Sequence, residues 1–308
     1  MKNCYVSIII TTYNRGEFLQ DILESIACQT YPSEFIEVIV VSDGEDHHNR
    51  QISMRSTECF SERLPYPKGP QILYIWRPKI GYDPGGCRNI GMQSARGDII
   101  IINDDDCLFD KKCIEEHLKW HDTGNAVIYG KVIDTKLSLT EESRRLIVSL
   151  YSSSLSLETS KREALARAFE APEVNYLESV FKDMSYSYLI NFIKHSTRIF
   201  KISKELEIAK RFTGKNLSFK KTSALAIGGF DKTFSGKYGY QDSDFARRLV
   251  GNGCIPIFDT FAIAYFIRPE YHYSFEQREI DKEYTNSLVK SRDYRKDIIQ
   301  NKGVRIFG

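Results

Sequence analysis

The 308-residue sequence lacks features that mark several large classes of protein. No uninterrupted apolar run comes near the roughly 18–20 residues that span a bilayer. The charges of 43 Lys and Arg against 41 Asp and Glu nearly cancel, so the net charge of +2 predicts no nucleic-acid partner. The seven cysteines include no Cys-x-x-Cys pair, which argues against a zinc cage and a disulfide framework. No small-residue cleavage site follows the start, so we expect no secretory signal and a cytoplasmic location.

The first third of the chain does have an alternation of short apolar runs with segments of helical periodicity. The runs have the length of strands and are apolar on both faces. Such strands, alternating with helices, indicate an α/β fold with a mostly parallel sheet that helices cover on both sides. The expected strands are Tyr5–Thr11, Glu37–Val41, Gln71–Trp76 and Asp98–Ile102, and the expected helices are 15–29 and Pro84–Ala95.

Acidic clusters follow two of these strands, at 43–46 and at 104–106. Ligands of parallel sheets bind outside the carboxyl ends of the strands, where these clusters would lie. Like charges about 4 Å apart repel by about 4 kcal/mol at an effective dielectric near 20, so we expect a divalent cation to offset the repulsion. The alternative is an acidic loop that only faces solvent.

The cluster Asp104-Asp105-Asp106 has a spacing suited to a metal. In an extended segment Asp104 and Asp106 share one face while Asp105 turns aside. Hard oxygen donors suit Mg²⁺ or Mn²⁺, and a metal held this way would clamp a diphosphate and stabilise its charge as it leaves.

A second constellation begins at Gly228-Gly229-Phe230-Asp231 and continues through 239–249. Apolar residues from Asp242 onward have helical spacing, which places Asp242 at or near a helix N-terminus, where the helix dipole favours a carboxylate. A carboxylate there is a candidate general base. The alternative is that Asp242 or Asp244 is an ordinary N-cap.

The middle of the chain, 131–211, is polar and has the pattern of a helical insertion. Nine Lys or Arg lie between Lys194 and Lys221 against two Glu, which would suit an anionic acceptor, an acidic membrane surface or a solvated helix face. The chain turns apolar again in 212–270, and 271–308 is a charged tail in which we expect a packing helix or an oligomer contact.

Six motifs in this order resemble those of family 2 glycosyltransferases, inverting enzymes with the GT-A nucleotide-sugar fold. The resemblance covers about 1–130 and 212–268. The motifs are Val6–Arg15, Val40–Gly44, Gly86–Gly91, Ala95–Asp98 leading into Asp104–Asp106, Gly228–Asp231 and Gln241–Asp244.

The resemblance implies a role for each matching residue. The half at 1–130 would bind a nucleotide sugar, with Asp43 accepting a hydrogen bond from the base, most often uracil. Asp104 and Asp106 would hold Mn²⁺ or Mg²⁺, while 212–270 would supply Asp242 as the catalytic base and Asp244 as a supporting carboxylate. The expected donor-binding residues are Thr11, Tyr13, Asn14, Asp43, Arg88, Asn89, Asp104, Asp105, Gly229 and Phe230.

Two positions depart from the family pattern. Gln241 stands where the family often has Glu. The register of the family's metal-binding His falls near Phe266, and the nearest imidazole, His272, is either a late metal ligand or a surface residue between two tyrosines.

We therefore expect single-displacement transfer of a sugar from a nucleoside-diphosphate donor, most often UDP-linked, to an acceptor hydroxyl, as in polysaccharide biosynthesis. The acceptor is left open among glycan, lipid-linked and small molecules, as are the oligomeric state and a peripheral association with the inner face of a membrane. Segments 235–240 and 190–215 are candidate lids. The alternatives are a sugar nucleotidyltransferase, which would normally carry a Gly-rich phosphate loop after the first strand, and a non-catalytic sugar-nucleotide-binding protein.

Overall fold

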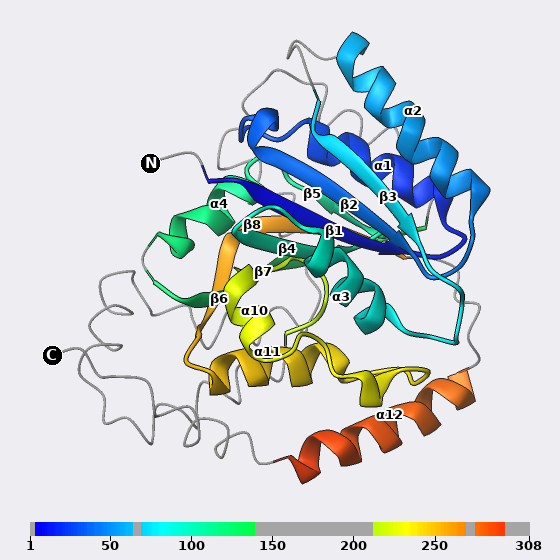
Figure 1. The fold of residues 1–308 in the computed structure, drawn as a ribbon, viewed down its shortest axis with the longest axis vertical. Helices are drawn as coiled ribbons and strands as arrows, with labels where there is room; N and C mark the ends of the chain where they lie inside the picture. Colours follow the sequence, from blue (N-terminus) through cyan, green and yellow to red (C-terminus); the bar gives the residue numbers. More distant parts are fainter. Residues whose placement is uncertain (1–3, 64–68, 123, 139–211, 269–274, 293–308) are drawn as a thin grey trace, which may run out of the picture.

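The computed structural model describes residues 4–63, 69–122, 124–138, 212–268 and 275–292, and the structural statements below concern these ranges. Eight strands form one mixed sheet in the order β3-β2-β1-β4-β7-β6-β8-β5. Helices cover both of its faces, with α1 and α2 on one side and α3 and α11 on the other (Figure 1). The expected α/β fold is confirmed.

The first half of the sheet is parallel. It consists of β1 (Val6–Thr12), β2 (Ile36–Ser42), β3 (Gln71–Trp76) and β4 (Ile99–Asp104), close to the four predicted strands. Every residue of β2 is buried, as expected for a strand covered on both faces, whereas β3 at the sheet edge is half exposed. The connecting helices are α1 (Gly16–Ala27), α2 (His47–Arg63) and α3 (Pro84–Ser94).

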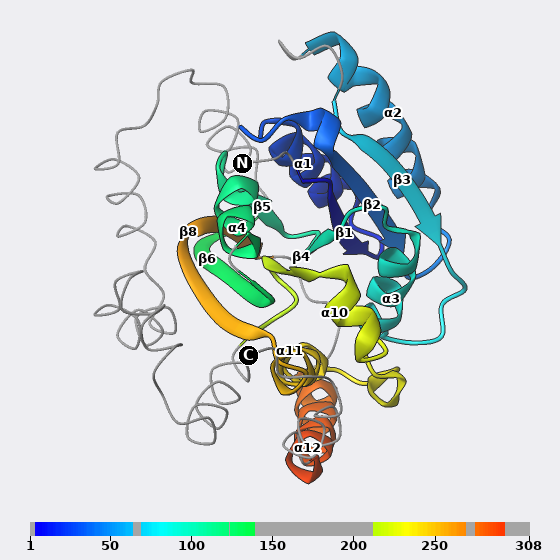
Figure 2. The same cartoon turned by 60° about the vertical axis from the view of Figure 1, so that its left-hand side comes forward.

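The second half of the sheet is mixed and strongly curled (Figure 2). β4 pairs antiparallel with β7 (Leu217–Lys220), which pairs antiparallel with β6 (Ala126–Ser138). β8 (Ile255–Arg268) runs parallel to β6 and antiparallel to the short β5 (Cys107–Phe109). The helices of this half are α4 (Cys113–His121), α10 (Lys221–Ala226) and α11 (Gln241–Gly251), with single turns at Ser33–Phe35 and Lys232–Phe234 elsewhere in the chain.

The expected helical insertion starts too early. Residues 131–138 belong to β6, where Lys131 pairs with Ile263 and Ser138 with Arg268 across a register shift. Pairing with a strand more than 120 residues away outweighs the local polar pattern, which favoured a helix. The rest of the expected insertion, 139–211, lies outside the described residues.

The strands divide the core into two layers. Ile8 and Ile10 of β1 pack with α1, whereas Ile9 packs on the opposite face with Met92 of α3. A Cβ at Gly91 would lie 2.5 Å from a methyl group of Ile9, so this glycine lets α3 approach β1 closely. The position of α3 matters because this helix carries Arg88.

The predicted helix in the charged tail is α12 (Phe275–Ser291), which lies beside α11 (Figures 1 and 2). Its Val289 joins the core, and its Asp281 carboxylate accepts a hydrogen bond from the backbone N–H of Tyr238 at 3.1 Å. No helix among the described residues is long and apolar enough to cross a membrane.

Candidate active site

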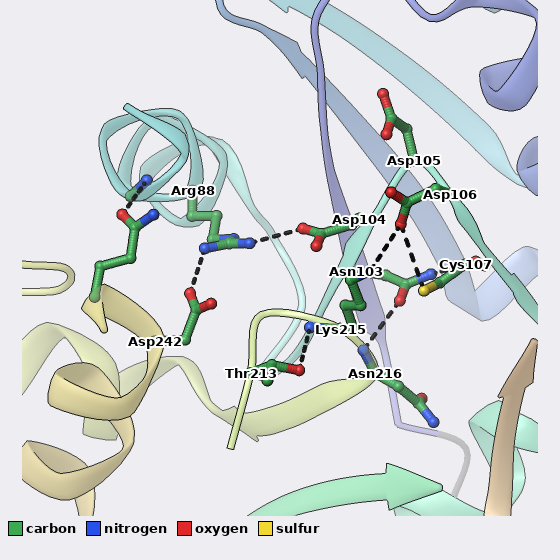
Figure 3. Close-up of polar contacts among 12 residues, drawn as sticks. Arg88, Asn103, Asp104, Asp105, Asp106, Cys107, Thr213, Lys215, Asn216 and Asp242 are labelled. Carbon is green, nitrogen blue, oxygen red and sulfur yellow. Dashed lines mark hydrogen bonds and ion pairs between the residues drawn. The ribbon is translucent and has the colours of Figure 1, made fainter. Parts of the chain in front are cut away.

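The acidic cluster lies at a turn rather than in an extended strand. β4 ends at Asp104, Asp105 and Asp106 form the turn, and β5 starts at Cys107. The alternation by which Asp104 and Asp106 were expected to share one face is therefore wrong, because that rule holds only for extended backbone. Figure 3 shows Asp104 directed toward Arg88 and Asp106 lying beside Cys107 and Lys215.

Three basic side chains contact the cluster. Arg88 Nη2 donates to Asp104 Oδ1 at 2.7 Å, Arg15 Nη1 lies 3.0 Å from Asp105 and 3.2 Å from Asp106, and Lys215 Nζ lies 3.3 Å from Asp106. The charge of these carboxylates is thus offset from within the chain. The divalent cation that was expected to offset their repulsion is therefore not required for that purpose.

The three carboxyl groups differ in acidity because their neighbours differ. Burial raises the pKa of Asp105 to about 7, against the opposing effect of Arg15. Burial also raises the pKa of Asp106, whereas Arg88 and then Lys215 outweigh burial and lower the pKa of Asp104.

Arg88 joins the acidic cluster to the candidate base. Its side chain is 2% exposed, and its Nη1 donates to Asp242 Oδ1 at 2.5 Å while Nη2 binds Asp104. Two carboxylates that are far apart in the sequence therefore share one guanidinium (Figure 3). The backbone at Gly214 passes close by, since a Cβ there would collide with the guanidinium.

Asp242 lies in the first turn of α11, as predicted. The helix begins at Gln241 after Tyr240, whose φ of 58° is left-handed. Asp242 binds Arg88 rather than capping the helix, so the N-cap interpretation is not what the structure shows. Burial raises the pKa of Asp242, with Arg88 acting in the opposite direction.

Gln241 has a structural partner in the backbone of α3. Its Oε1 accepts a hydrogen bond from the backbone N–H of Gly85 at 3.0 Å, which ties the start of α11 to the start of α3. Arg88 and Asp242, one on each helix, are thereby held at a fixed separation.

Asp244 is directed away from Asp242, since residues two apart on a helix do not face each other. It is fully buried and binds Arg248 Nε at 2.8 Å and Arg292 Nη1 at 2.6 Å. Arg292 also binds Asp231 at 2.6 Å, so Asp244 anchors the segment after α12 to α11.

The expected nucleobase residues gather at the ends of β1 and β2. Thr11 and Tyr13 lie at the end of β1, and Asn14 donates its backbone N–H to Asp46. Asp43 Oδ1 accepts two hydrogen bonds from Arg77, at 2.9 and 2.7 Å. Lys79 Nζ lies 3.2 Å from the centre of the half-exposed Tyr13 ring and 3.6 Å from Asp43 Oδ2.

Asn89 of α3 contacts Gly229 and Phe230, and the Phe230 ring centre lies 5.3 Å from Arg88 Cζ. The Asn89 amide binds the backbone of Phe230 with both of its ends, at 2.8 and 2.7 Å. Phe230 is 2% exposed and stacks on Phe245 with ring centres 4.0 Å apart, so its contact with Arg88 is structural. Direct donor contact by these three residues stays a prediction.

Sequence reasoning missed three basic residues: Arg15, Arg77 and Lys215. Arg15 is the third residue after β1 and Arg77 is the first after β3, so their place at carboxyl ends of strands was a usable signal. Lys215 Nζ lies 3.3 Å from the ring centre of Phe266, the position where the family register would place a metal-binding His. His272 lies outside the described residues.

Two lysines of the basic segment between Lys194 and Lys221 bind groups of the protein itself. Lys215 binds Asp106, and Lys221 Nζ donates to the backbone oxygen of Ala95. These two lysines thus have partners inside the protein.

The candidate lid at 235–240 is bound at two points. The backbone N–H of Gly236 donates to Tyr82 O at 2.8 Å, and the backbone N–H of Tyr238 donates to Asp281.

The donor set suits a hard divalent metal in type. Carboxylate oxygens of one short segment are available at Asp104 and Asp106, the usual donors to Mg²⁺ and Mn²⁺. Among the described residues no three His, Cys, Asp or Glu side chains are arranged to hold a metal ion, so further ligands would come from the diphosphate and water.

Comparison with solved structures identifies the same GT-A fold that the sequence motifs resemble. Over 98% of this chain and 70% of the other, the fold matches a mannosyltransferase from Pyrobaculum calidifontis in complex with GDP-Man and Mn²⁺, with a TM-score of 0.58 and 15% identity. Over 88% of this chain and 60% of the other, it matches residues 1–349 of TarS from S. aureus in complex with UDP-GlcNAc, with a TM-score of 0.53 and 14% identity. The fold is that of the GT-A glycosyltransferases.

The family model of glycosyl transferase family 2 matches residues 7–181, and the chain belongs to this family. A relative that matches most of the chain is a chondroitin synthase from Pasteurella multocida, 24% identical over 94% of this chain and 28% of that protein. The chain spans less than two thirds of the length of the curated relatives compared.

Proposed function

We propose that this chain transfers a sugar from a UDP-linked donor to an acceptor hydroxyl by a single displacement with inversion. The observation that carries the proposal is the Arg88 contact with both Asp104 and Asp242. It brings the carboxylate that would face the leaving diphosphate beside the carboxylate that would act as base.

The surroundings of Asp43 favour uracil. Arg77 occupies Oδ1 with two N–H groups, and Oδ2 keeps only the longer contacts to Lys79 at 3.6 Å and to the Asp83 N–H at 3.4 Å. Uracil offers one ring N–H, which a single open oxygen can accept. Guanine offers two adjacent N–H groups, which would need both oxygens of the carboxylate.

Asp104 and Asp106 would hold Mn²⁺ or Mg²⁺, which supplies positive charge to the departing diphosphate. The chain's own cations have complementary roles. Arg88, Arg15 and Lys215 already neutralise the acidic segment, and Arg88 and Lys215 are long side chains that could turn to phosphate oxygens when the donor arrives.

Asp242 would accept the proton of the acceptor hydroxyl at its carboxylate. Burial raises its pKa, which makes the carboxylate a stronger base than one in water. The hydrogen bond from Gly85 to Gln241 keeps α11 oriented, so that Asp242 stays beside Arg88.

The test is nucleotide release from a panel of UDP-sugars and GDP-mannose, with Mn²⁺ and without it. We expect Mn²⁺-dependent UDP release from at least one UDP-sugar and little GDP release. Tight UDP binding in calorimetry without release from any donor would instead indicate a non-catalytic sugar-nucleotide-binding protein. Preferential use of GDP-mannose would contradict the role assigned to Arg77 and Asp43.

A further inference from the structure

A short stretch of chain just before β7 contacts both the acidic cluster and the candidate base (Figure 3). Lys215 Nζ lies 3.3 Å from Asp106 Oδ1, and the backbone N–H of Gly214 is hydrogen-bonded to the Asp242 carboxylate. A Cβ at Gly214 would lie 2.0 Å from Arg88 Nη2, so the backbone itself touches the guanidinium. The position of this stretch therefore affects both ends of the candidate active site.

The stretch ends in a left-handed turn at Asn216, where φ is 56°. Asparagine tolerates this conformation better than most residues, but the conformation persists only where surrounding contacts over-determine it. Here the Asn216 N–H donates to Asn103 Oδ1 at 3.0 Å, and its carbonyl oxygen accepts from the N–H of Gly130 at 2.9 Å. Asn103 directly precedes Asp104, so the turn is tied to the strand that carries the acidic cluster.

The side chain of Asn216 is fully buried, and both of its polar atoms are hydrogen-bonded. The amide nitrogen donates to the backbone oxygens of Ala262 at 2.7 Å and Lys131 at 3.3 Å. Oδ1 accepts from His117 Nε2 at 2.8 Å and from the Cys113 thiol at 3.2 Å. The turn is thus held from α4, β6 and β8 together.

His117 of α4 is a buried neutral imidazole with both ring nitrogens bound. Its ring is fully buried, and burial lowers its pKa. Because the Nε2 proton goes to Asn216, Nδ1 accepts from the Ser218 hydroxyl at 2.9 Å, and that hydroxyl accepts from His121 Nε2 at 2.9 Å. A ring bound at both nitrogens has one orientation, so His117 presents its Nε2 proton to Asn216 in a fixed direction.

The turn at Asn216 determines where the preceding side chain lies. Lys215 leaves the chain one residue before the turn, and its ammonium group lies 3.3 Å from Asp106 Oδ1 and 3.3 Å from the centre of the Phe266 ring. A long flexible side chain reaches such a point only if its backbone is held there. Misplacing a binding group by about 1 Å can cost up to about 100-fold in an enzyme site.

We propose that His117 is a positioning residue for donor binding, acting through Asn216 on Lys215. In the proposed glycosyl transfer, on which this inference rests, Lys215 binds a phosphate oxygen of the donor beside Asp106. His117 is buried away from the donor, and it holds the turn that carries Lys215 to that point.

The test is a double-mutant cycle read in the affinity for Mn²⁺-UDP, measured by calorimetry at a temperature where each variant is folded. Lys215→Met should weaken binding by about 10–100-fold, the usual range for a hydrogen bond to a charged group. His117→Asn keeps an amide near the position of Nδ1 but does not reach Asn216. It should weaken binding by about tenfold when Lys215 is present and by less than about twofold in Lys215→Met, where nothing is left to position.

Two variants separate positioning from stability. His117→Gln is the matched control, because its longer amide can donate to Asn216 from the position of Nε2, and its affinity should stay within about twofold of wild type. His121→Leu removes a member of the same hydrogen-bonded chain that does not touch Asn216. It should lower the melting temperature and leave the affinity for Mn²⁺-UDP unchanged.

The outcomes distinguish this inference from the proposed function. Equal losses from His117→Asn with Lys215 and without it, or no loss in either chain, would overturn the positioning role. Asn216→Gly keeps the left-handed φ but removes the amide that His117 binds, so it should reproduce the cycle and decides the question if His117→Asn does not fold. Failure of wild type to bind Mn²⁺-UDP would overturn the proposed function, and this inference with it.

Discussion

Two neighbouring groups of polar side chains are satisfied in opposite ways. At the carboxyl-terminal edge of the parallel strands, carboxylates are bound by long cationic side chains, with Arg88 shared between Asp104 and Asp242. In the neutral network, which starts at Asn216 beside the carboxyl end of β4 and runs through His117 and Ser218 to His121, uncharged groups are joined by hydrogen bonds. The ionic edge can exchange its partners for a charged ligand, whereas the neutral network fixes one pattern of protons.

The comparison predicts that removing the cationic side chain of Arg88 from the ionic edge has the largest effect on stability. Arg88→Met leaves the partly buried carboxylates of Asp104 and Asp242 with no cation between them. Removing one partner of a buried ion pair typically costs about 3–5 kcal/mol in the free energy of unfolding. We expect a loss at the lower end of this range, because the two carboxylates are 26% and 25% exposed. Urea unfolding measures this, with Arg88→Lys as the control, which keeps the charge and should lose less. Equal stability of Arg88→Met and wild type would contradict the buried Arg88 contacts.

In the neutral network the largest effect should come from Asn216. Its side chain binds His117 and Ala262, and its backbone N–H donates to Asn103 Oδ1 at 3.0 Å with φ at 56°. Asn216→Ala leaves these buried groups unpaired and should lower the free energy of unfolding by about 2–3 kcal/mol. Asn216→Gly, which tolerates the positive φ, should be slightly less damaging. A loss below that of an average surface substitution would show that the chain of hydrogen bonds is not formed.

The same network predicts a dependence of stability on pH. The unfolded chain takes up a proton on His121 near pH 6.5, whereas the folded protein resists doing so until about pH 3. The stabilising contribution is therefore complete above pH 6.5 and is lost as the pH falls, by about 2 kcal/mol at pH 5. Urea unfolding at several pH values should show this loss in wild type and a smaller one in His121→Gln. Identical pH profiles would argue against a neutral buried imidazole.

The smallest effect is expected where the starts of α3 and α11 meet. Gln241→Glu keeps an oxygen that can accept from the Gly85 N–H and adds a negative charge at the start of α11, where the helix dipole favours it. The change in the free energy of unfolding should stay within about 1 kcal/mol. Gln241→Leu, which has no acceptor, serves as the contrast and should be clearly less stable.

Much of the ionic edge could be predicted from the sequence, because its residues lie in short motifs at strand ends. The four parallel strands, the acidic cluster after β4 and the place of Asp242 in the first turn of α11 were all predictable from local patterns. The fold that these imply matches the GT-A neighbours.

The rest depends on contacts between distant segments. Lys215 reaches Asp106 through the curl and order of the strands, which no local pattern encodes. The turn at Asp105 breaks the alternation assumed for an extended chain, and the pairing of β6 with β8 overrides the polar texture of residues 131–138. The hydrogen-bonded chain from Asn216 to His121 joins two segments about a hundred residues apart, so no motif marked it.

The most direct test of the proposed reaction compares Asp242→Asn with wild type in two measurements on one preparation. Transfer or UDP release should fall by about 10²–10⁴-fold, the usual contribution of a positioned general base. The affinity for Mn²⁺-UDP, measured by calorimetry, should change little, because the asparagine amide still presents an oxygen to Arg88. Near-normal turnover by Asp242→Asn would contradict the assignment of Asp242 as the base.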